Sequence, residues 1–385
     1  MSIREVQHQA RAIRIIQRAL ASTRMPHAYL FTGPEGVGRE MMAMRLAQIL
    51  LCKSPVVGQA PAEDEPPYTE ACNACDDCRM VQAGTHPDLF VIHRLLVREH
   101  PDPTIRRQKA LAISAEVVRH FLIEPVGRRP SRGRAKVFII REAERLTDTA
   151  QNRLLKTLEE PPPSTFLILI TSAQDRMLPT TRSRCQRVSF QPLPAQFVTE
   201  QLAALRPDTP DAERLFAARH CGGSLGAALR LIEDGLFATK RTWGDRLVEL
   251  LRPARGFAPH LLAQPFITDA KEISKQVAER EPDISESDAI RMGVQTLLAA
   301  LASFYQDAQR RVSGADVPPT NADQLGVIDL LAQTHSSRQL VAALHQLAQA
   351  DAAIGRNAAA ELTAETLFIQ LANISQGRPA LRVAL

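Results

Sequence analysis

The sequence has few aromatic side chains and no long apolar run. Phenylalanine, tyrosine and tryptophan together make up 4% of the 385 residues, and there is a single Trp. Proteins that bind single-stranded nucleic acid stack its bases on aromatic side chains, so this scarcity argues against such a binding surface. Pure apolar runs are short, as at residues 166–170. A membrane-spanning helix needs about 18 or more apolar residues, and we therefore expect none.

The chain also lacks a strong charge of one sign, and its first residues do not show the pattern expected of a secretory leader. Its 47 Lys and Arg nearly balance 42 Asp and Glu, which leaves a net charge of +5 and only weak attraction to polyanions. The first residues mix Arg with Glu and precede no apolar segment, which predicts a cytoplasmic protein. Disulfides are rare in that compartment, so the 6 cysteines need another role.

The first half of the chain alternates short apolar runs with helical patterns. An amphipathic helix is predicted over residues 3–20, and further helices over 40–51 and 147–160. The strand-like runs, each bounded by Gly, Pro or polar residues, are 28–31, 89–92, 137–140, 166–170 and 187–190. Such alternation predicts an α/β domain, a parallel sheet with helices on both faces.

Strand signals end near residue 190, and the length of the chain allows two or three domains. We predict a phosphate-loop domain over 1–190, a small helical lid over 191–236 and a helical bundle over 237–385. Two polar stretches inside the first domain, 53–71 and 94–112, are predicted to be mobile loops.

A degenerate phosphate loop follows the first predicted strand. Gly33 and Gly38 match the two glycines of the pattern G-x-x-x-x-G-K-S/T, and Gly36 lies between them. The lysine position holds Arg39, and the Ser/Thr position that binds magnesium holds Glu40. A carboxylate there repels phosphate, at about 1 to 4 kcal/mol for each pair of charges. We expect a loop that keeps its fold without binding ATP tightly; alternatively, the glycines only form a turn.

The acidic pair that phosphate-loop ATPases carry after the third strand is also altered. Residues 137–140 are apolar and are followed by Arg141 and Glu142, so a cation replaces the magnesium-binding Asp. Both metal contacts are therefore missing. Glu142 could still polarise a water molecule, but without a metal it is better interpreted as a surface residue.

Four cysteines have the spacing of a zinc site. Cys72, Cys75 and Cys78 are separated by two residues each, and Cys52 lies upstream at the end of the phosphate-loop helix. Four thiolates close a tetrahedral zinc site and leave no position for water, which predicts a structural Zn²⁺ in a module at 52–78. The alternative is that the thiols are reduced and unligated.

Several short motifs together resemble one family. They are the cysteine pattern inside a phosphate-loop domain, residues 152–162 (NRLLKTLEEPP), 183–185 (SRC), 27–31 (HAYLF) and 86–88 (HPD). With them the chain is similar to the delta-prime subunits of the bacterial DNA polymerase III clamp loader. The resemblance covers residues 1 to about 235 well; beyond that it depends mainly on residues 356–357 and 362–374.

The resemblance implies an AAA+ module with a lid, and a helical collar that holds a heteropentameric ring together. The implied partners are gamma or tau and delta subunits, the sliding clamp and, through the complex, primed DNA, with no membrane. The chain would belong to a DNA polymerase holoenzyme without independent catalytic activity. In this family the Ser-Arg-Cys motif carries an arginine finger for the ATP of a neighbouring subunit, a role that falls to Arg184. The alternative for Arg184 is a local contact with an acid or a helix end.

Two other interpretations remain open. The gamma and tau motors share the cysteines and Ser-Arg-Cys, but they have an intact phosphate loop and a lid arginine where this chain has Gly226. An active gamma-like ATPase is the alternative that these losses disfavour. A zinc-dependent DNA-binding regulator would use residues 127–136 (GRRPSRGRAK) against phosphates. The alternative for that stretch is a solvated loop.

Overall fold

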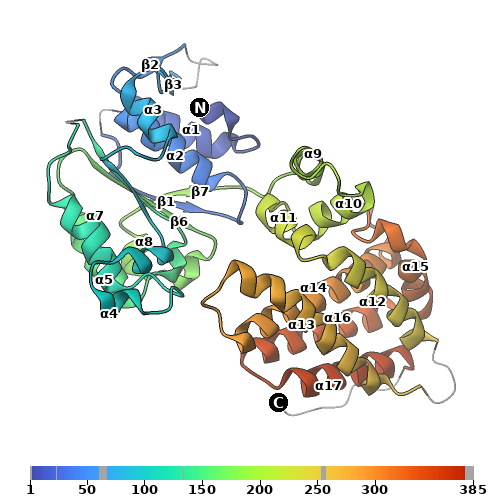
Figure 1. The fold of residues 1–385 in the computed structure, drawn as a ribbon. Helices are drawn as coiled ribbons and strands as arrows, with labels where there is room; N and C mark the ends of the chain where they lie inside the picture. The colour runs from blue at the N-terminus through green and yellow to red at the C-terminus, as the bar shows by residue number, and fades with distance from the viewer. Residues whose placement is uncertain (1, 23, 60–66, 133, 253–256, 378–385) are drawn as a thin grey trace. The chain divides into compact units, whose positions relative to one another are not determined.

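The computed structural model describes the chain except residues 1, 23, 60–66, 133, 253–256 and 378–385 (Figure 1). It contains two compact units, Met1–Pro194 and Ala195–Leu385. Within the described residues, no helix combines the length and the apolar character that crossing a membrane requires.

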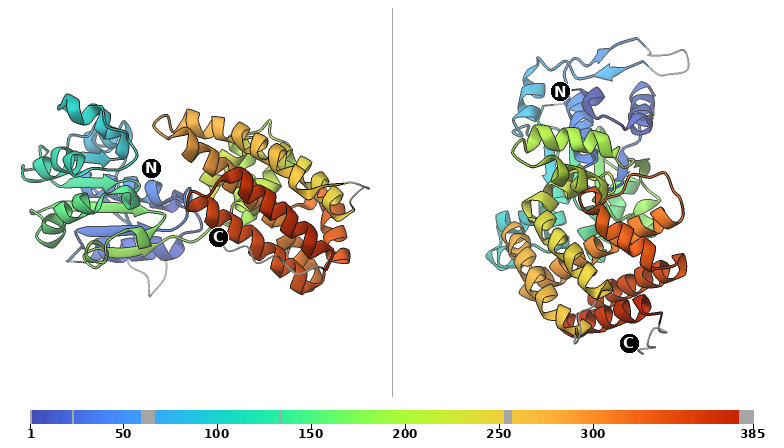
Figure 2. Two further views of the ribbon diagram at one scale, coloured as in Figure 1. Left: turned by 90° about the horizontal axis from the view of Figure 1, so that it is seen from below. Right: turned by 90° about the vertical axis from the view of Figure 1, so that its right-hand side faces the viewer.

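The first unit is built on a parallel sheet of five strands with helices on both faces (Figures 1 and 2). The strands lie in the order β4-β5-β6-β1-β7. Their bounds are β1 Ala28–Thr32, β4 Leu89–Ile92, β5 Lys136–Ile140, β6 Thr165–Thr171 and β7 Gln186–Ser189. All five predicted strands are confirmed. The central strands β1, β5 and β6 are mainly apolar and almost entirely buried, as is typical of strands covered on both faces.

Eight helices of the described part accompany this sheet. They are α1 Ala10–Ala21, α2 Arg39–Leu51, α3 Asp76–Gln82, α4 Pro103–Arg106, α5 Ala115–Val118, α6 Glu124–Val126, α7 Asp148–Glu159 and α8 Pro179–Arg182. Thr147 caps α7, accepting a hydrogen bond from the Ala150 N–H, and the helix ends before the proline run at 161–163. Leu154 and Leu158 of α7 pack with Leu167 and Leu169 of β6 in one buried core cluster.

Two details of the predicted organisation were wrong. The segment 3–20 is not one helix: a 3₁₀ turn at Ile3–Glu5 precedes α1, and His8 between them has a positive φ. The stretch 94–112 is not a mobile loop, because it forms a 3₁₀ helix at Arg94–Glu99 and then α4. Four of its apolar residues, Leu96, Val97, Ile105 and Ala110, are buried in the core cluster. In 53–71, Val56–Val57 (β2) pairs with Thr69–Glu70 (β3), while residues 60–66 lie outside the described part (Figure 2).

The second unit is helical throughout its described residues. Its helices are α9 Ala195–Leu205, α10 Asp211–His220, α11 Leu225–Glu233, α12 Leu236–Leu251, α13 Ala263–Arg280, α14 Glu286–Val312, α15 Leu325–Thr334, α16 Ser337–Gly355 and α17 Ala360–Ser375. This confirms the predicted fold class, an α/β domain followed by helices. The finer division at 236 into lid and collar stays a prediction.

A buried lysine lies among the helices of this second unit. Lys240 of α12 is fully buried and forms an ion pair with Asp323 at 2.5 Å. Its ammonium lies 4.7 Å from the ring centre of Phe216 in α10 and 5.6 Å from that of Phe304 in α14. Burial lowers the pKa of Lys240, and its hydrogen bond to Asp323 opposes that shift. One charged side chain thus ties three helices together.

Candidate functional site

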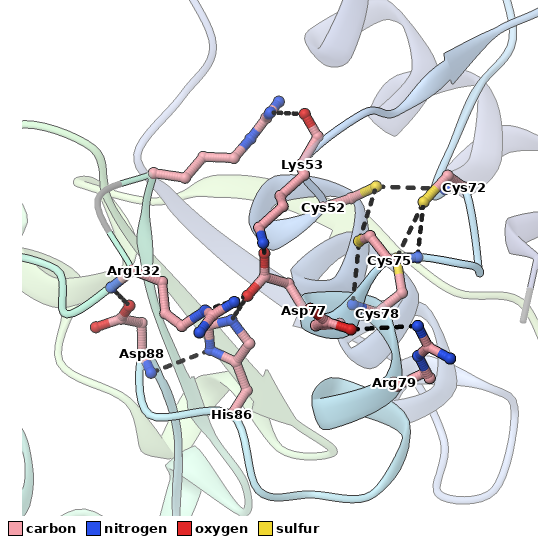
Figure 3. Close-up of polar contacts among 12 residues, drawn as sticks. Cys52, Lys53, Cys72, Cys75, Asp77, Cys78, Arg79, His86, Asp88 and Arg132 are labelled. Carbon is pink, nitrogen blue, oxygen red and sulfur yellow. Dashed lines mark hydrogen bonds and ion pairs between the residues drawn. The ribbon is translucent and has the colours of Figure 1, made fainter.

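The four predicted zinc ligands come together at the end of α2 and the start of α3 (Figure 3). Cys52 directly follows Leu51, the last residue of α2, and Cys72 follows β3. Cys75 caps α3, accepting from the Cys78 N–H, and Cys78 lies in the first turn of that helix. The sequence spacing therefore brings the two helix ends and the β2–β3 ribbon to one point.

The geometry of the four sulfurs fits a tetrahedral metal. All four lie within 4.8 Å of one another, with Cys52 to Cys75 at 4.0 Å and Cys72 to Cys78 at 3.9 Å. A tetrahedral Zn²⁺ with Zn–S bonds near 2.3 Å needs sulfurs about 3.8 Å apart. Hydrogen bonds from the backbone of Ala74 and Cys75 lower the pKa of Cys72 to about 6, whereas burial raises the pKa of Cys52 and Cys78. The cluster can bind a metal ion.

A charged network connects this cysteine cluster to the sheet (Figure 3). The carboxylate of Asp77, beside Cys78, is buried and accepts a hydrogen bond from Arg132 Nε at 2.5 Å. His86 Nε2 lies 3.4 Å from the same carboxylate, and His86 Nδ1 accepts from the Asp88 N–H. Asp88 in turn accepts from the backbone of Ser131 and Arg132. The motif at 86–88 thus has a structural role, which its pattern alone did not reveal.

The same contacts bear on the basic stretch 127–136. Arg132 is bound to Asp77, and Arg134 donates to the carbonyl oxygens of Leu50 and Lys53. These two arginines anchor the stretch to the cysteine cluster. Their contacts support a structural role for part of this segment, whose binding to DNA stays an untested alternative.

The predicted phosphate loop is a glycine-rich turn between β1 and α2. Gly33, Gly36 and Gly38 all have positive φ values. A Cβ on Gly33 would lie 2.6 Å from the Phe190 carbonyl oxygen, so only glycine fits there. Arg39, at the start of α2, is buried, which lowers its pKa, although the carboxylates of Glu144 and Glu35 oppose that shift.

The two residues that replace the magnesium contacts bind each other. Glu40 of α2 forms an ion pair with Arg141, the residue after β5. Both side chains are partly exposed, so the pair contributes little to stability. The pair joins the two residues that, by their place in the sequence pattern, correspond to the magnesium-binding hydroxyl and carboxylate of phosphate-loop ATPases. Glu142 pairs instead with Arg145 at 2.9 Å and with Arg94 at 3.4 Å.

Arg184 lies in the turn between α8 and β7, and it has a local partner. Its Nε donates to Glu159 Oε1 at 2.6 Å, its Nη2 contacts the same oxygen, and its Nη1 donates to the Thr180 carbonyl oxygen at 2.9 Å. About a third of the side chain is exposed. Burial of the neighbouring Cys185 raises the pKa of its thiol to about 12, so that cysteine is inert packing.

The sequence did not single out two partners in these pairs. Glu159 was part of the motif at 152–162 without a role of its own, and Asp77 was only a spacer between cysteines. The pairing of Glu40 with Arg141 could have been predicted from the sequence. An acidic and a basic residue stand at the two positions whose side chains bind one magnesium ion in phosphate-loop ATPases. Gly226, the second residue of α11, lies in the other unit.

Comparison with known proteins finds similarity to subunits of DNA polymerase III. A family model described as DNA polymerase III, delta subunit, matches residues 8–194. DNA polymerase III subunit delta' of Bacillus subtilis is 29% identical over 269 residues, which cover 70% of this chain and 72% of that protein. Subunit delta' of Pseudomonas aeruginosa is 35% identical over 60% of this chain and 64% of its own length. Subunit tau of Escherichia coli is 30% identical over 60% of this chain, but over 32% of its own length.

Proposed function

Because this chain belongs to the delta' family of DNA polymerase III clamp-loader subunits, we propose that it is the non-motor member of the loader. In this role it helps to load the sliding clamp onto primed DNA, with gamma or tau and delta subunits as its partners. It does not hydrolyse ATP itself, and it supplies Arg184 to the ATP bound by a neighbouring subunit. The alternative, an active gamma-like ATPase, requires a magnesium site in this chain.

The ion pair between Glu40 and Arg141 carries this proposal. A nucleoside triphosphate needs magnesium to neutralise its charge during phosphoryl transfer. In phosphate-loop ATPases a Ser or Thr hydroxyl and an Asp carboxylate hold this ion. Here both positions carry charged groups that satisfy each other. With Arg39 buried nearby, the loop keeps its shape without the groups that hold magnesium ATP.

Arg184 is suited to a role in trans for a different reason. Arginine presents five N–H donors in a planar fork, which matches the oxygens of a phosphate group. The side chain lies on an exposed turn and belongs to a phosphate-loop domain that has lost its own metal contacts. A donor supplied to a neighbour can stabilise transition-state charge and make hydrolysis depend on correct assembly.

We further propose that Cys52, Cys72, Cys75 and Cys78 hold a structural Zn²⁺. The four thiolates would occupy all four coordination positions, so the ion would have no site for water or substrate. Its contribution would be to fix α2, α3 and the β2–β3 ribbon together.

Calorimetry on the isolated chain tests the absence of an ATP site. We expect no saturable heat with magnesium ATP at micromolar protein, because each like-charge contact at Glu40 costs about 1 to 4 kcal/mol, or roughly one to three powers of ten in affinity. The double variant Arg39→Lys with Glu40→Thr should remain inactive as an ATPase, since Arg141 still occupies the metal position. A tight magnesium-dependent site in the native chain would instead support the gamma-like alternative.

A further inference from the structure

Helix α7 supports the turn that carries Arg184. Gln151 of α7 is fully buried; its Nε2 donates to the Leu146 carbonyl oxygen, and its Oε1 accepts from the Leu178 N–H at 2.8 Å. Leu178 precedes α8, the short helix before the turn. At the other end of α7, His27 Nε2 donates to the Leu158 carbonyl oxygen at 2.8 Å. Both ends of the helix are therefore held by the core of the unit.

Glu159, the last residue of α7, contacts the Arg184 guanidinium along one edge. Its Oε1 accepts from Nε at 2.6 Å and also contacts Nη2, while the Thr180 carbonyl oxygen accepts from Nη1 at 2.9 Å. These contacts use three of the five N–H donors that an arginine carries. Two donors remain for a further acceptor, so Arg184 can bind a phosphate oxygen without leaving Glu159.

We propose that Glu159 is a positioning residue for Arg184, which holds the guanidinium in one orientation for an acceptor on the neighbouring subunit. This inference rests on the proposed trans role of Arg184. An arginine side chain has many rotamers, and fixing one before the neighbour arrives removes an ordering cost from the encounter. The pair is too exposed to matter much for folding, with 33% of the Arg184 side chain and 46% of the Glu159 side chain accessible.

Two other roles for Glu159 predict different behaviour. If the pair were only a surface contact, its loss would change nothing in the assembled complex. If Glu159 competed with phosphate for the guanidinium, its loss would accelerate clamp loading. If Glu159 positions Arg184, its loss should slow clamp loading and leave folding unchanged, because only the orientation of the Arg184 guanidinium changes.

The test uses the complete reconstituted clamp loader with Glu159→Gln in this subunit. We expect the clamp-loading rate to fall about three- to tenfold, because glutamine keeps an acceptor oxygen but loses the charge that strengthens the contact, while the Tm of the isolated chain and its assembly into the complex stay as in the wild type. Glu159→Asp keeps the charge on a shorter side chain, so its loading rate should lie between those of the wild type and Glu159→Gln. The matched control is Glu160→Gln, because Glu160 is exposed and its carboxylate has no ion-pair partner among the described residues; this control should load normally.

A double variant separates the inference from the function on which it rests. If Glu159 acts through Arg184, adding Glu159→Gln to Arg184→Ala should cause no further loss. Normal loading by Arg184→Ala would refute the proposed trans role. Slow loading by Arg184→Ala together with normal or faster loading by both Glu159 variants would leave that role intact and overturn the inference.

Discussion

Replacing Cys75 with serine should release one zinc ion per chain and loosen residues 52–82 while the parallel sheet stays folded. Cys75 is both a member of the four-sulfur cluster and the cap of α3. Structural zinc contributes on the order of 10 kcal/mol of folding free energy to a small module. The loss should stay local, because the core of β1, β5 and β6 with α7 contains none of the four ligands. Elemental analysis gives the zinc content, and hydrogen exchange locates the loosened segment.

The loss of Cys75 should also loosen one segment outside the cysteine cluster. Hydrogen exchange should also rise in the basic stretch 127–136, because Arg132 and Arg134 are bound to Asp77, Leu50 and Lys53 of the cluster region. Cys221→Ser is the matched control, since Cys221 lies in the helical unit, outside the cluster, and should leave zinc content unchanged. A folded, reduced wild-type sample without metal would refute the zinc proposal.

Replacing Arg184 with alanine should leave the chain folded and assembled but impair the loader. The contact with Glu159 is exposed, so its loss should cost about 1 kcal/mol or less. At the one ATP site that the finger serves, the catalytic rate should fall by roughly 10³ to 10⁵. The DNA-stimulated ATPase of the whole complex would fall only in part, because its other sites keep their own fingers. Clamp loading should suffer more, since it needs the sites to act together.

Arg184→Lys tests whether the planar guanidinium is needed in addition to the positive charge. Lysine keeps the charge but cannot reproduce the planar fork, so it should be nearly as damaging as alanine. Arg182→Ala is a suitable control, because Arg182 is close in sequence and its ion pair is with Asp175 instead. ATPase and loading assays of the purified complexes measure the effect. Normal loading by Arg184→Ala, or unfolding of that variant, would contradict the proposed role.

Local patterns predicted the sheet and the cysteine cluster well. The runs at 137–140 and 166–170 are apolar on both faces, and they are the neighbouring strands β5 and β6. The glycines of the phosphate loop and the cysteines of the cluster have spacings that only a few backbone geometries satisfy. In each case a short segment of sequence determines the structure, because the residues that interact are close together along the chain.

What the sequence did not predict depends on contacts between distant segments. Glu40 and Arg141 meet because β1 and β5 both lie beside β6, an arrangement set by strand order. The segment 94–112 was misinterpreted because its apolar residues are few and irregularly spaced, although Ile105 and Val97 are buried in the core. The sequence motif singled out Arg184 as a candidate, and its role stays a prediction, whereas its partner Glu159 became visible only in three dimensions.

The salt bridge between Glu40 and Arg141 also bears on whether this subunit could regain an ATP site through single substitutions. Arg141→Asp alone would place a second carboxylate beside Glu40, and the two would repel each other. Glu40→Thr alone would leave an unpaired cation where magnesium must bind. Neither intermediate would gain the magnesium contacts, so restoring them would take both changes, in addition to the lysine that Arg39 replaces. A single substitution at this pair therefore cannot give the loop a nucleotide site.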